Sequence, residues 1–471
     1  MRLNRRSPSC ILGTLLTFSL VFLLIQLNLI PLFGRYEGDV TKSYQAALMA
    51  KKQSYQFEAL SKFSNLLIRF HISGFLIDSK LLKSILELRD VSPVLNKYCT
   101  LLCNNATASQ FGVISHVDIS KNFLEGAKEA GFSHFEVIGR DPRVLPMRIS
   151  KRHDIPYHHF FVYKDYLIQL VVFYLRNDSY FWHGKIDWSQ VSQTGSWMTK
   201  QWSHDQKLYG NRGEGAYDKM EFAEVKVDNV YFMVPKYPKK FLNQIQHSTF
   251  LECNYERAAK FVTRHYDDGD VVGERFRSNA KDILIAGAAV LDELGIPFWL
   301  SSGTCLSWFR ECRIIGHSLD VDFGMKIEDY SVRLIPAMEM AGLMLVHQFG
   351  KRSDSYELSF VKDQLKLDIF FFYEEGNTLW NGGSDTSTGE KYKYIFPWFD
   401  LCWTEFVRIK VRVPCQTLSY VEANYGKSWN TKVTSWNWKS SPPNVIPNGQ
   451  WPKEEWPEVM QVFEIIEVEE S

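Results

Sequence analysis

The sequence PFWLSSGTCLSWFRECRIIGHSLDVDFGM, residues 297–325, is the most informative part of the chain. Its first residues are typical of a short strand, and we expect Ser302, Gly303 and Thr304 to form the turn that leads from this strand into a helix. Small residues at such a turn let backbone N–H groups approach phosphate oxygens, and the helix N-terminus adds a partial positive charge. The turn is therefore a candidate phosphate-binding site.

Two aspartates close this stretch in the segment DVDFG. If the segment is a strand, its side chains alternate, so that Asp320 and Asp322 point to one face while Val321 and Phe323 point into the core. Two like charges side by side destabilise a fold unless a cation neutralises them. Because all the ligand atoms would be oxygens, the pair predicts a site for Mg²⁺ or Mn²⁺.

A third carboxylate, Asp368, lies in LKLDIFFFY, a run that is typical of a buried central strand. An unpaired buried charge is very unfavourable, and coordination of a metal together with Asp320 and Asp322 would remove that cost. An isolated Asp-x-Asp pair is common on solvated strand edges, but the ordered set of turn, pair and later strand aspartate is much more specific. We predict that the three aspartates form one catalytic metal site.

Residues 275–294, upstream of this stretch, predict a helix because apolar or small residues recur at spacings of three and four. The stripe consists of Phe276, Ala280, Ile283, Gly287, Leu291 and Leu294. Gly287 is its weak member, since glycine costs about 1 kcal/mol relative to alanine inside a helix. Gly295 and Pro297 follow and are common signals for a helix end.

The composition limits the possible partners. A chain of 471 residues is too long for one compact core, so we expect two globular domains with appendages. Lys and Arg together number 54, as do Asp and Glu, and this balance gives no general electrostatic case for binding nucleic acid. The residues of the candidate site, and not the overall charge, therefore indicate the class of substrate.

The N-terminus has the pattern of a membrane anchor. Arg2, Arg5 and Arg6 precede an apolar run at residues 11–33, which is long enough to span a bilayer as a helix. A cleavable signal peptide shares the basic start, but this run is longer and has no small-x-small cleavage site. The arginines favour a cytosolic N-terminus, so we expect an uncleaved type II anchor with the rest of the chain in the lumen.

Sequons and cysteines are compatible with a lumenal location. Asn105 and Asn177 begin Asn-x-Ser/Thr triplets and are candidate glycosylation sites. Seven cysteines follow the predicted anchor, and their odd number leaves at least one without an intramolecular disulfide partner. Cys99 and Cys103 have no second ligand pair nearby, which favours a local disulfide or two buried thiols over a zinc site.

We divide the chain into five parts and expect the α/β (α+β) class for the folded ones. The parts are a cytosolic tail at 1–10, the anchor at 11–33, a stem at 34–61, an α/β domain at 62–268 and a catalytic domain at 269–471. The first domain contains a helix candidate at 120–132 and aromatic strand-like runs at 159–176. Its His158, His159 and His183 fall in such runs, and we expect them to be structural rather than metal ligands.

Several segments resemble the LicD branch of the nucleotidyltransferase-like fold, a family of phosphocholine and polyol-phosphate transferases. They are WLSSGTCLSWFRECRII, DVDFG, LKLDIFFFYEE, FPWFDLCWTEFV, VEANYGKSW and SPPNVIPNGQWP, and the likeness extends over the whole chain. The resemblance implies a catalytic domain with a mixed sheet flanked by helices. It further implies a Golgi enzyme that transfers ribitol 5-phosphate from CDP-ribitol to the O-mannosyl glycan of α-dystroglycan and releases CMP, with other Golgi glycan enzymes as further candidate partners.

The same resemblance implies roles for individual residues. Metal binding falls to Asp320, Asp322 and Asp368, and phosphate contacts fall to Ser302, Gly303 and Arg310. In the implied reaction an acceptor hydroxyl attacks the phosphorus that carries ribitol. Asp368 is the candidate to orient or deprotonate that hydroxyl.

Two other functions fit parts of the pattern. A Golgi glycosyltransferase with an ordinary Asp-x-Asp site needs neither the Ser-Gly turn nor the later strand aspartate. A non-catalytic lumenal scaffold would only be destabilised by converging carboxylates.

Two features near the C-terminus complete the predictions. For each of the ten tryptophans between residues 299 and 456 we expect core packing rather than stacking on cytidine or a sugar. The proline-rich segment at residues 440–452 is expected to lack regular structure. It is either an ordered loop over the acceptor site or a surface connection.

Overall fold

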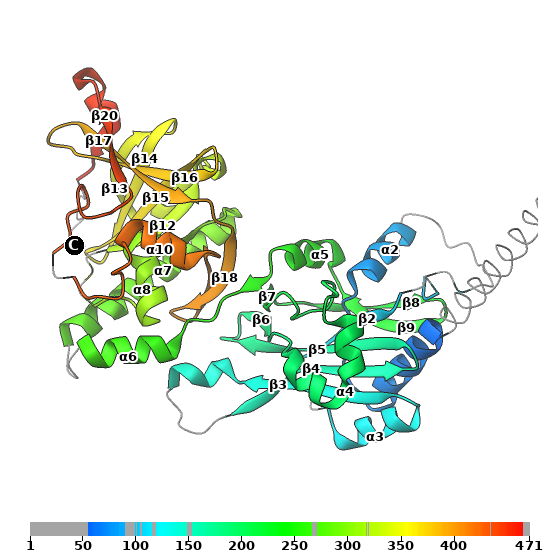
Figure 1. Cartoon of the computed structure of the whole chain (residues 1–471). Coiled ribbons are helices and arrows are strands. Elements are labelled where there is room, and N and C mark those ends of the chain that lie inside the picture. Colours follow the sequence, from blue (N-terminus) through cyan, green and yellow to red (C-terminus); the bar gives the residue numbers. More distant parts are fainter. Residues whose placement is uncertain are drawn as a thin grey trace, which may run out of the picture.

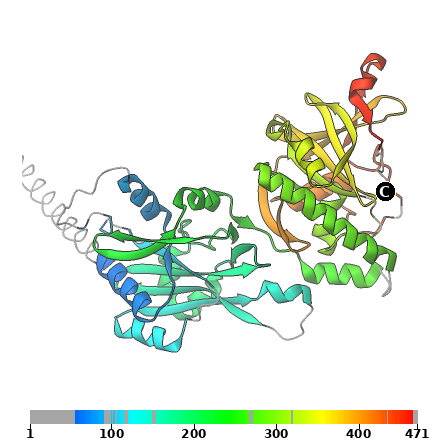
Figure 2. The same ribbon diagram turned by 180° about the vertical axis from the view of Figure 1, so that it is seen from behind.

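Two β-sheets organise the chain, and they lie in two lobes that Figures 1 and 2 show from opposite sides. The computed structural model describes residues 55–89, 99, 101–103, 106–114, 119–147, 153–265, 271–316, 318, 320–433 and 435–464. The predicted tail and anchor, most of the predicted stem, and Asn105 fall outside these residues. No helix within the described ranges has the length and apolar character needed to cross a membrane. The combination of sheets and helices confirms the α/β class.

A twelve-stranded sheet contains all strands of the first lobe, with helices flanking it. Its elements are β1 (Phe75–Leu76), α2 (Ser79–Arg89), β2 (Ala108–Ile114), α3 (Lys121–Glu129), β3 (Ser133–Arg140), η1 (Pro142–Met147), β4 (Asp154–Tyr163), β5 (Tyr166–Arg176), β6 (Tyr180–His183), α4 (Trp188–Trp202), β7 (Glu214–Asp218), β8 (Phe222–Val227), β9 (Val230–Pro235), α5 (Pro238–Gln246) and β10 (Thr249–Phe250). The helix predicted at 120–132 is α3, where the Phe123 amide donates to Ser120 Oγ at the N-cap. The strand-like run at 159–176 is confirmed as the hairpin of β4 and β5.

The core of the first lobe begins earlier in the chain than the sequence indicated. Residues 55–69 form a helix, and its Ala59, Leu60 and Phe63 are fully buried. Phe63 contacts the rings of Phe111 and Phe161 with centroid distances of 5.2 Å in both cases. The last part of the segment that we predicted as a stem therefore packs as part of this lobe.

The three histidines that we expected to be structural, His158, His159 and His183, are buried in the first lobe. His158 Nε2 and His183 Nδ1 donate to the Gly184 carbonyl at 2.8 and 3.0 Å. His159 Nδ1 lies 3.1 Å from His134 Nε2. Burial lowers the pKa of His158 and of His159 to about 3 and the pKa of His183 to about 4. All three side chains are therefore neutral at neutral pH.

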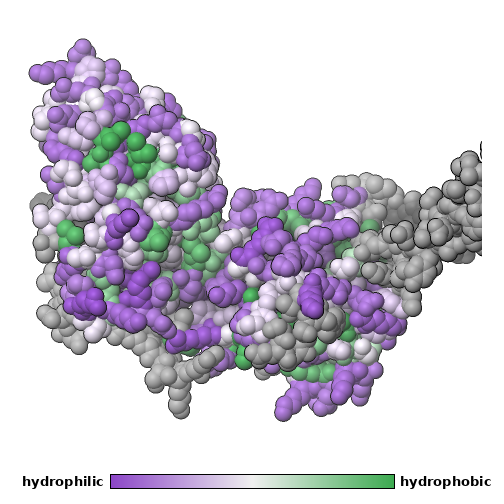
Figure 3. Space-filling model, viewed as in Figure 1, coloured by the Kyte–Doolittle hydropathy of each residue, from purple (hydrophilic) through white to green (hydrophobic). Residues whose placement is uncertain are grey.

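A nine-stranded sheet forms the centre of the second lobe. The elements of this lobe are α6 (Tyr255–His265), α7 (Val271–Leu294), β11 (Trp299–Leu300), α8 (Ser302–Glu311), β12 (Asp320–Lys326), η2 (Ile327–Asp329), α9 (Leu334–Met340), β13 (Met344–Lys351), β14 (Asp354–Lys362), β15 (Leu365–Glu375), β16 (Thr378–Ser384), β17 (Glu390–Pro397), β18 (Leu401–Phe406), β19 (Ile409–Pro414), α10 (Thr417–Tyr425), β20 (Val445–Gln450), η3 (Lys453–Glu455), α11 (Trp456–Val459) and β21 (Met460–Val462). Figure 3 shows that hydrophilic residues dominate one face of both lobes, with apolar residues gathered in small areas.

Helix α7 is the helix predicted from the apolar stripe, and it packs against β12 and β15. The structure explains why a glycine occupies position 287 within the helix. A Cβ atom there would lie 2.5 Å from Leu367 Cδ2 and 3.2 Å from Phe323 Cε2. The glycine therefore lets the helix approach the two strands closely. Gly295 follows the helix with a φ of 71°, a conformation that glycine adopts without strain.

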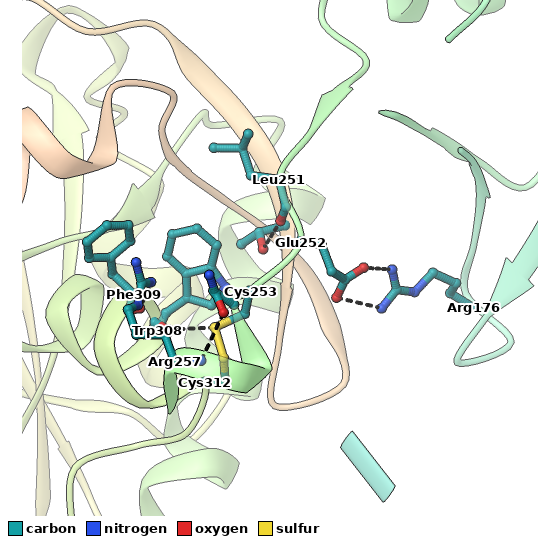
Figure 4. Close-up of a disulfide and its surroundings, with 10 residues drawn as sticks. Arg176, Leu251, Glu252, Cys253, Arg257, Trp308, Phe309 and Cys312 are labelled. Carbon is teal, nitrogen blue, oxygen red and sulfur yellow. Dashed lines mark hydrogen bonds and ion pairs between the residues drawn. A yellow bond between two sulfur atoms is a disulfide. The ribbon is translucent and has the colours of Figure 1, made fainter. Parts of the chain in front are cut away.

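One hairpin of the second lobe extends the sheet of the first. Strand β10 pairs with β7 on one side and with β18 on the other, where Phe250 is opposite Trp403. The buried guanidinium of Arg176 reinforces this junction. Its Nη1 lies 2.5 Å from Glu252 Oε2 (Figure 4). Its Nε lies 3.0 Å from Glu405 Oε2. Hydrogen bonding and ion pairing thus connect the lobes.

Six of the seven cysteines that follow the predicted anchor form disulfides. The pairs are Cys99–Cys103, Cys253–Cys312 and Cys402–Cys415. The first pair confirms a local disulfide over a zinc site, and Cys305 is the expected unpaired cysteine, as a buried thiol. In the second pair, Cys253 lies just before α6 and Cys312 is the C-cap of α8, so this disulfide connects the two helices (Figure 4).

The expectation for the proline-rich segment at 440–452 is wrong, because much of it forms strand β20. This strand pairs with β17 at the edge of the second sheet, with Pro447 opposite Tyr392. An edge strand tolerates proline, since the missing N–H is not needed by a further neighbour. Pro442, which precedes the strand, lines the cavity described next.

Candidate active site

Parallel pairing of β12 with β15 brings the three aspartates together. Asp322 is directly opposite Asp368, and Asp320 is opposite Lys366. Val321 and Phe323 are buried in the core, as alternation requires, so the aspartates share the other face of the sheet. One carboxylate oxygen from each aspartate lies within 4.8 Å of the others. Asp322 and Asp368 are buried, whereas Asp320 is partly exposed.

The predicted turn is the first turn of helix α8, which differs from our expectation. Ser301 is the N-cap, and the helix already includes Ser302 and Gly303. The Thr304 amide donates to Asp322 Oδ2 at 3.2 Å, and the Asp322 amide donates to Thr304 Oγ1 at 2.8 Å. This first turn therefore positions an aspartate. A Cβ at Gly303 would lie 3.4 Å from Asp322 Oδ2, so this position is in van der Waals contact with the carboxylate.

The electrostatics of the cluster favour a bound cation. Burial, followed by the charges of Asp320 and Asp368, raises the pKa of Asp322 well above its ordinary value. Burial also raises the pKa of Asp368, against the opposing effect of Lys366, whose Nζ lies 2.8 Å from Asp368 Oδ2. The other oxygen, Asp368 Oδ1, is buried without a hydrogen-bond partner. Three converging carboxylates with one unsatisfied oxygen fit the oxygen ligand set of Mg²⁺ or Mn²⁺.

Lys366 and Glu357 are two polar residues of the site that we did not predict. Although burial opposes the effect, the charge of Asp368 raises the pKa of Lys366 above its ordinary value. Glu357 on β14 has a pKa of about 8, caused by burial and then by Asp368. The floor of the site therefore combines four acidic groups with a single lysine.

A cavity of about 550 Å³ contains the aspartates. Its floor is one face of the second sheet, and residues of β12 to β17 line it. Its opposite wall comes from α8, α10 and the chain after α10, and it includes Ser302, Gly303, Tyr425, Trp429, Trp436 and Trp438. The volume falls within the usual range for small-molecule sites of about 300–1,000 Å³.

The tryptophans of this wall correct the expectation of core packing. Trp299 and Trp308 are buried in the core of the lobe, as predicted. Trp436 and Trp438 are instead 42% and 41% exposed and line the cavity together with Trp429. Their flat apolar surfaces suit the stacking of a nucleobase or a sugar ring.

Arg310 and Asn177 are less available than the sequence indicated. Arg310 lines the cavity, but its Nη2 lies 2.6 Å from Glu311 Oε1, so a neighbouring carboxylate already neutralises its charge. It also lies about one helix length away from Ser302. Asn177 is in the turn between β5 and β6, and its Nδ2 atom is buried. A glycan at Asn177 would require a different side-chain rotamer.

Comparisons with known proteins identify relatives of this chain. The family described as Fukutin N-terminal matches residues 2–281, and the family described as LicD/FKTN/FKRP, nucleotidyltransferase domain, matches residues 295–416. The chain is 40% identical to the proteins named Ribitol-5-phosphate transferase FKTN of Macaca fascicularis and Mus musculus and 39% identical to that of Homo sapiens. Each comparison covers 98% of this chain and 100% of the relative. The aspartates, Lys366 and the first turn of α8 all lie within the second match.

Proposed function

The chain belongs to the fukutin family with its LicD-type nucleotidyltransferase domain, and on this basis we propose that it is a ribitol-5-phosphate transferase. The observation that supports this activity most directly is the convergence of Asp320, Asp322 and Asp368 within 4.8 Å in a ligand-sized cavity. The donor we propose is CDP-ribitol, with CMP as the leaving group.

The proposed donor matches the two sides of the cavity. We place its negatively charged diphosphate next to the aspartates, because Mg²⁺ or Mn²⁺ held by the three carboxylates would neutralise charge on the phosphate oxygens. Lys366 adds a fixed positive charge on the same floor. The cytosine ring is flat and belongs against the aromatic wall of Trp436 and Trp438.

The chain's own residues have defined tasks in the proposed transfer. The oxygen of an acceptor hydroxyl forms a bond to the phosphorus that carries ribitol, and the bond from this phosphorus to the CMP oxygen breaks. Asp368 orients the hydroxyl and accepts its proton. Thr304 holds Asp322 in place through two hydrogen bonds, which keeps the carboxylate directed at the cavity.

The acceptor and compartment that we propose are the O-mannosyl glycan of α-dystroglycan and the Golgi lumen. The apolar run at residues 11–33, after three arginines, supports a single type II anchor. The three disulfides of the folded lobes support an oxidising compartment. Expression of the full chain with an epitope tag at either end, followed by protease protection of vesicles, tests the topology. Protection of the N-terminal tag instead of the C-terminal tag would contradict it.

Transfer assays with purified protein test the activity itself. We expect release of CMP from CDP-ribitol in the presence of Mn²⁺ and an O-mannosyl glycopeptide, and no turnover of UDP-sugars. Asp322→Ala should remove this activity, while Asp282→Ala, at an exposed position on α7, should retain it. Turnover of a UDP-sugar alone would favour a glycosyltransferase. Equal activity of both variants would show that the aspartates are not catalytic.

A further inference from the structure

Helix α10 carries two tyrosines that lie close to the start of helix α8. Tyr420 is buried, and its hydroxyl lies 2.8 Å from Ser301 Oγ and accepts a hydrogen bond from the Ser302 amide at 3.3 Å. The ring of Tyr420 stacks on that of Phe396, with 4.5 Å between the ring centres. These contacts hold α10 against the first turn of α8, so the hydroxyl of Tyr420 has a structural task.

Tyr425, the second tyrosine, is the last residue of α10 and lines the active-site cavity. Its hydroxyl lies 3.9 Å from the place that a Cβ atom on Gly303 would occupy, and Asp322 Oδ2 lies 3.4 Å from the same place. The hydroxyl and the carboxylate are therefore near one another, beside the first turn of α8. The ring of Tyr425 packs against Trp436, with 5.0 Å between the ring centres, and this contact holds the side chain in position.

The hydroxyl of Tyr425, unlike that of Tyr420, has no partner in the fold. It forms no hydrogen bond with any residue that the structure describes, although it lies at the wall of the cavity. A tyrosine hydroxyl has an ordinary pKa of about 10, so at neutral pH it carries its proton and can donate a hydrogen bond. A donor that the fold leaves without an acceptor is available to a ligand.

Other donors near the start of α8 are already bound by the protein. The amides of Ser302 and Thr304 donate to side chains of the second lobe. The charges of Arg310 and Lys366, which also line the cavity, are each paired with a neighbouring carboxylate. A diphosphate at this end of the cavity therefore needs a further donor. The hydroxyl of Tyr425 lies beside the aspartates, where we place the diphosphate.

We propose that the Tyr425 hydroxyl donates a hydrogen bond to the CMP phosphate of the donor, and that this bond strengthens as negative charge grows on the leaving group. This inference rests on the proposed function. In the proposed transfer the bond between the phosphorus that carries ribitol and the CMP oxygen breaks, and its electron pair remains on that oxygen. Tyr425 keeps its proton throughout, because it stabilises the charge as a hydrogen-bond donor and not as an acid.

Calorimetry with CMP in the presence of Mn²⁺ tests the contact without reference to transfer. Tyr425→Phe removes one oxygen and keeps the ring that packs against Trp436. We expect this variant to bind CMP about three- to tenfold more weakly than the wild type, and to bind cytidine, which lacks the phosphate, with unchanged affinity. Tyr231→Phe, at an exposed position of the first lobe, is the matched control and should bind both as the wild type does.

Transfer kinetics then separate a role in the reaction from a role in binding. In Tyr425→Phe the kcat for transfer from CDP-ribitol should fall by about 10- to 100-fold, more than the affinity for CMP falls, because the hydrogen bond is strongest when charge has built up on the leaving group. Tyr425→Leu removes the ring as well. If Tyr425 only packs against Trp436, Tyr425→Phe should bind and react as the wild type does while Tyr425→Leu is impaired, and this result would overturn the inference.

Different results would contradict the inference and the proposed function. A wild-type protein that binds CMP but transfers no ribitol phosphate would contradict the proposed function, and the affinity of Tyr425→Phe for CMP would still decide whether the contact exists. Equal affinities of the wild type and Tyr425→Phe for CMP would overturn the contact. An equal loss of affinity for cytidine and CMP would overturn it too, because the variant would then have disturbed the aromatic wall. A wild type that does not bind CMP would contradict both.

Discussion

Replacement of Asp322 by asparagine should stabilise the metal-free protein while it abolishes activity. Asp322 is buried between Asp320 and Asp368, with oxygens of all three within 4.8 Å. Asparagine has nearly the same shape, and its side-chain oxygen still accepts the hydrogen bond from the Thr304 amide. The change therefore removes one negative charge and leaves the packing intact.

The size of the effect follows from the separation of the charges. At 4.8 Å and an effective dielectric constant of about 20, two unit charges repel by about 3.5 kcal/mol. Asp322 faces two carboxylates, but Lys366 offsets part of the charge of Asp368, and partial protonation limits the repulsion. We expect a net gain of about 2–4 kcal/mol in the free energy of unfolding at neutral pH, or a rise of about 5–10 °C in the melting temperature of the lobe.

The pH dependence has a definite sign. The pKa of Asp322 is raised in the folded protein by burial and by its two acidic neighbours. The wild type therefore loses stability as pH rises above the unfolded value of about 4 towards the folded value, and the variant does not. The difference between the two proteins should be small in acid and grow towards neutral pH.

Thermal unfolding with EDTA or with Mn²⁺, together with the transfer assay, measures both effects. In the wild type, Mn²⁺ at about a hundred times its Kd should add about 2.7 kcal/mol of stability, whereas Asp322→Asn should respond weakly. Asp282→Asn serves as the matched control on the exposed face of α7. A lower melting temperature of Asp322→Asn in EDTA, or an undiminished response to Mn²⁺, would refute the idea that the three carboxylates share one cation.

Three further predictions concern the frame around the site. Cys253→Ser/Cys312→Ser opens a disulfide across 59 residues and should cost about 4 kcal/mol, which would appear as a lower urea midpoint; an unchanged midpoint would contradict it. Gly324→Ala places a Cβ 2.4 Å from Trp299 Cε2 and should destabilise the protein by about 2–3 kcal/mol in the same assay. Glu357→Gln should remove a loss of stability that the wild type shows between pH 4.5 and about pH 8, because burial and Asp368 raise the pKa of Glu357 to about 8. Melting temperatures across this pH range test the last prediction, and parallel curves for the two proteins would disprove it.

Local periodicity was sufficient to locate the main elements of the second lobe. The alternation in DVDFG identified a strand, and the apolar spacing upstream identified α7 together with its end at Gly295. Predictions from the local sequence failed where a residue far away in the chain determines the backbone conformation. Pro447 lies in a strand because β17 pairs with it, and the first turn of α8 begins at Ser302 because Asp322 and Tyr420 bind its amides.

The site was predictable to the extent that it depends on alternation along single strands. The three aspartates follow from alternation, and Lys366 could have been found by the same rule, since it lies two residues before Asp368. Glu357 carries no comparable signal, because its place depends on the pairing of β14 with β15. The aromatic wall was equally hidden, as a tryptophan in a cavity and a tryptophan in a core look alike in sequence.

The pairing of β10 with β18 changes how the two lobes must be understood. The boundary that we predicted at residue 268 divides the sequence into two parts, but the sheet that starts in the first part ends with β18 and β19 in the second. Val411 and Val413 of β19 are buried in the core that also holds α7 and β15. This hairpin therefore has one face in the core of the second lobe and one edge on the first sheet, so both lobes share it. Substitutions at Arg176 should therefore affect the active site through the position of this hairpin, because Arg176 pairs with Glu405 on β18.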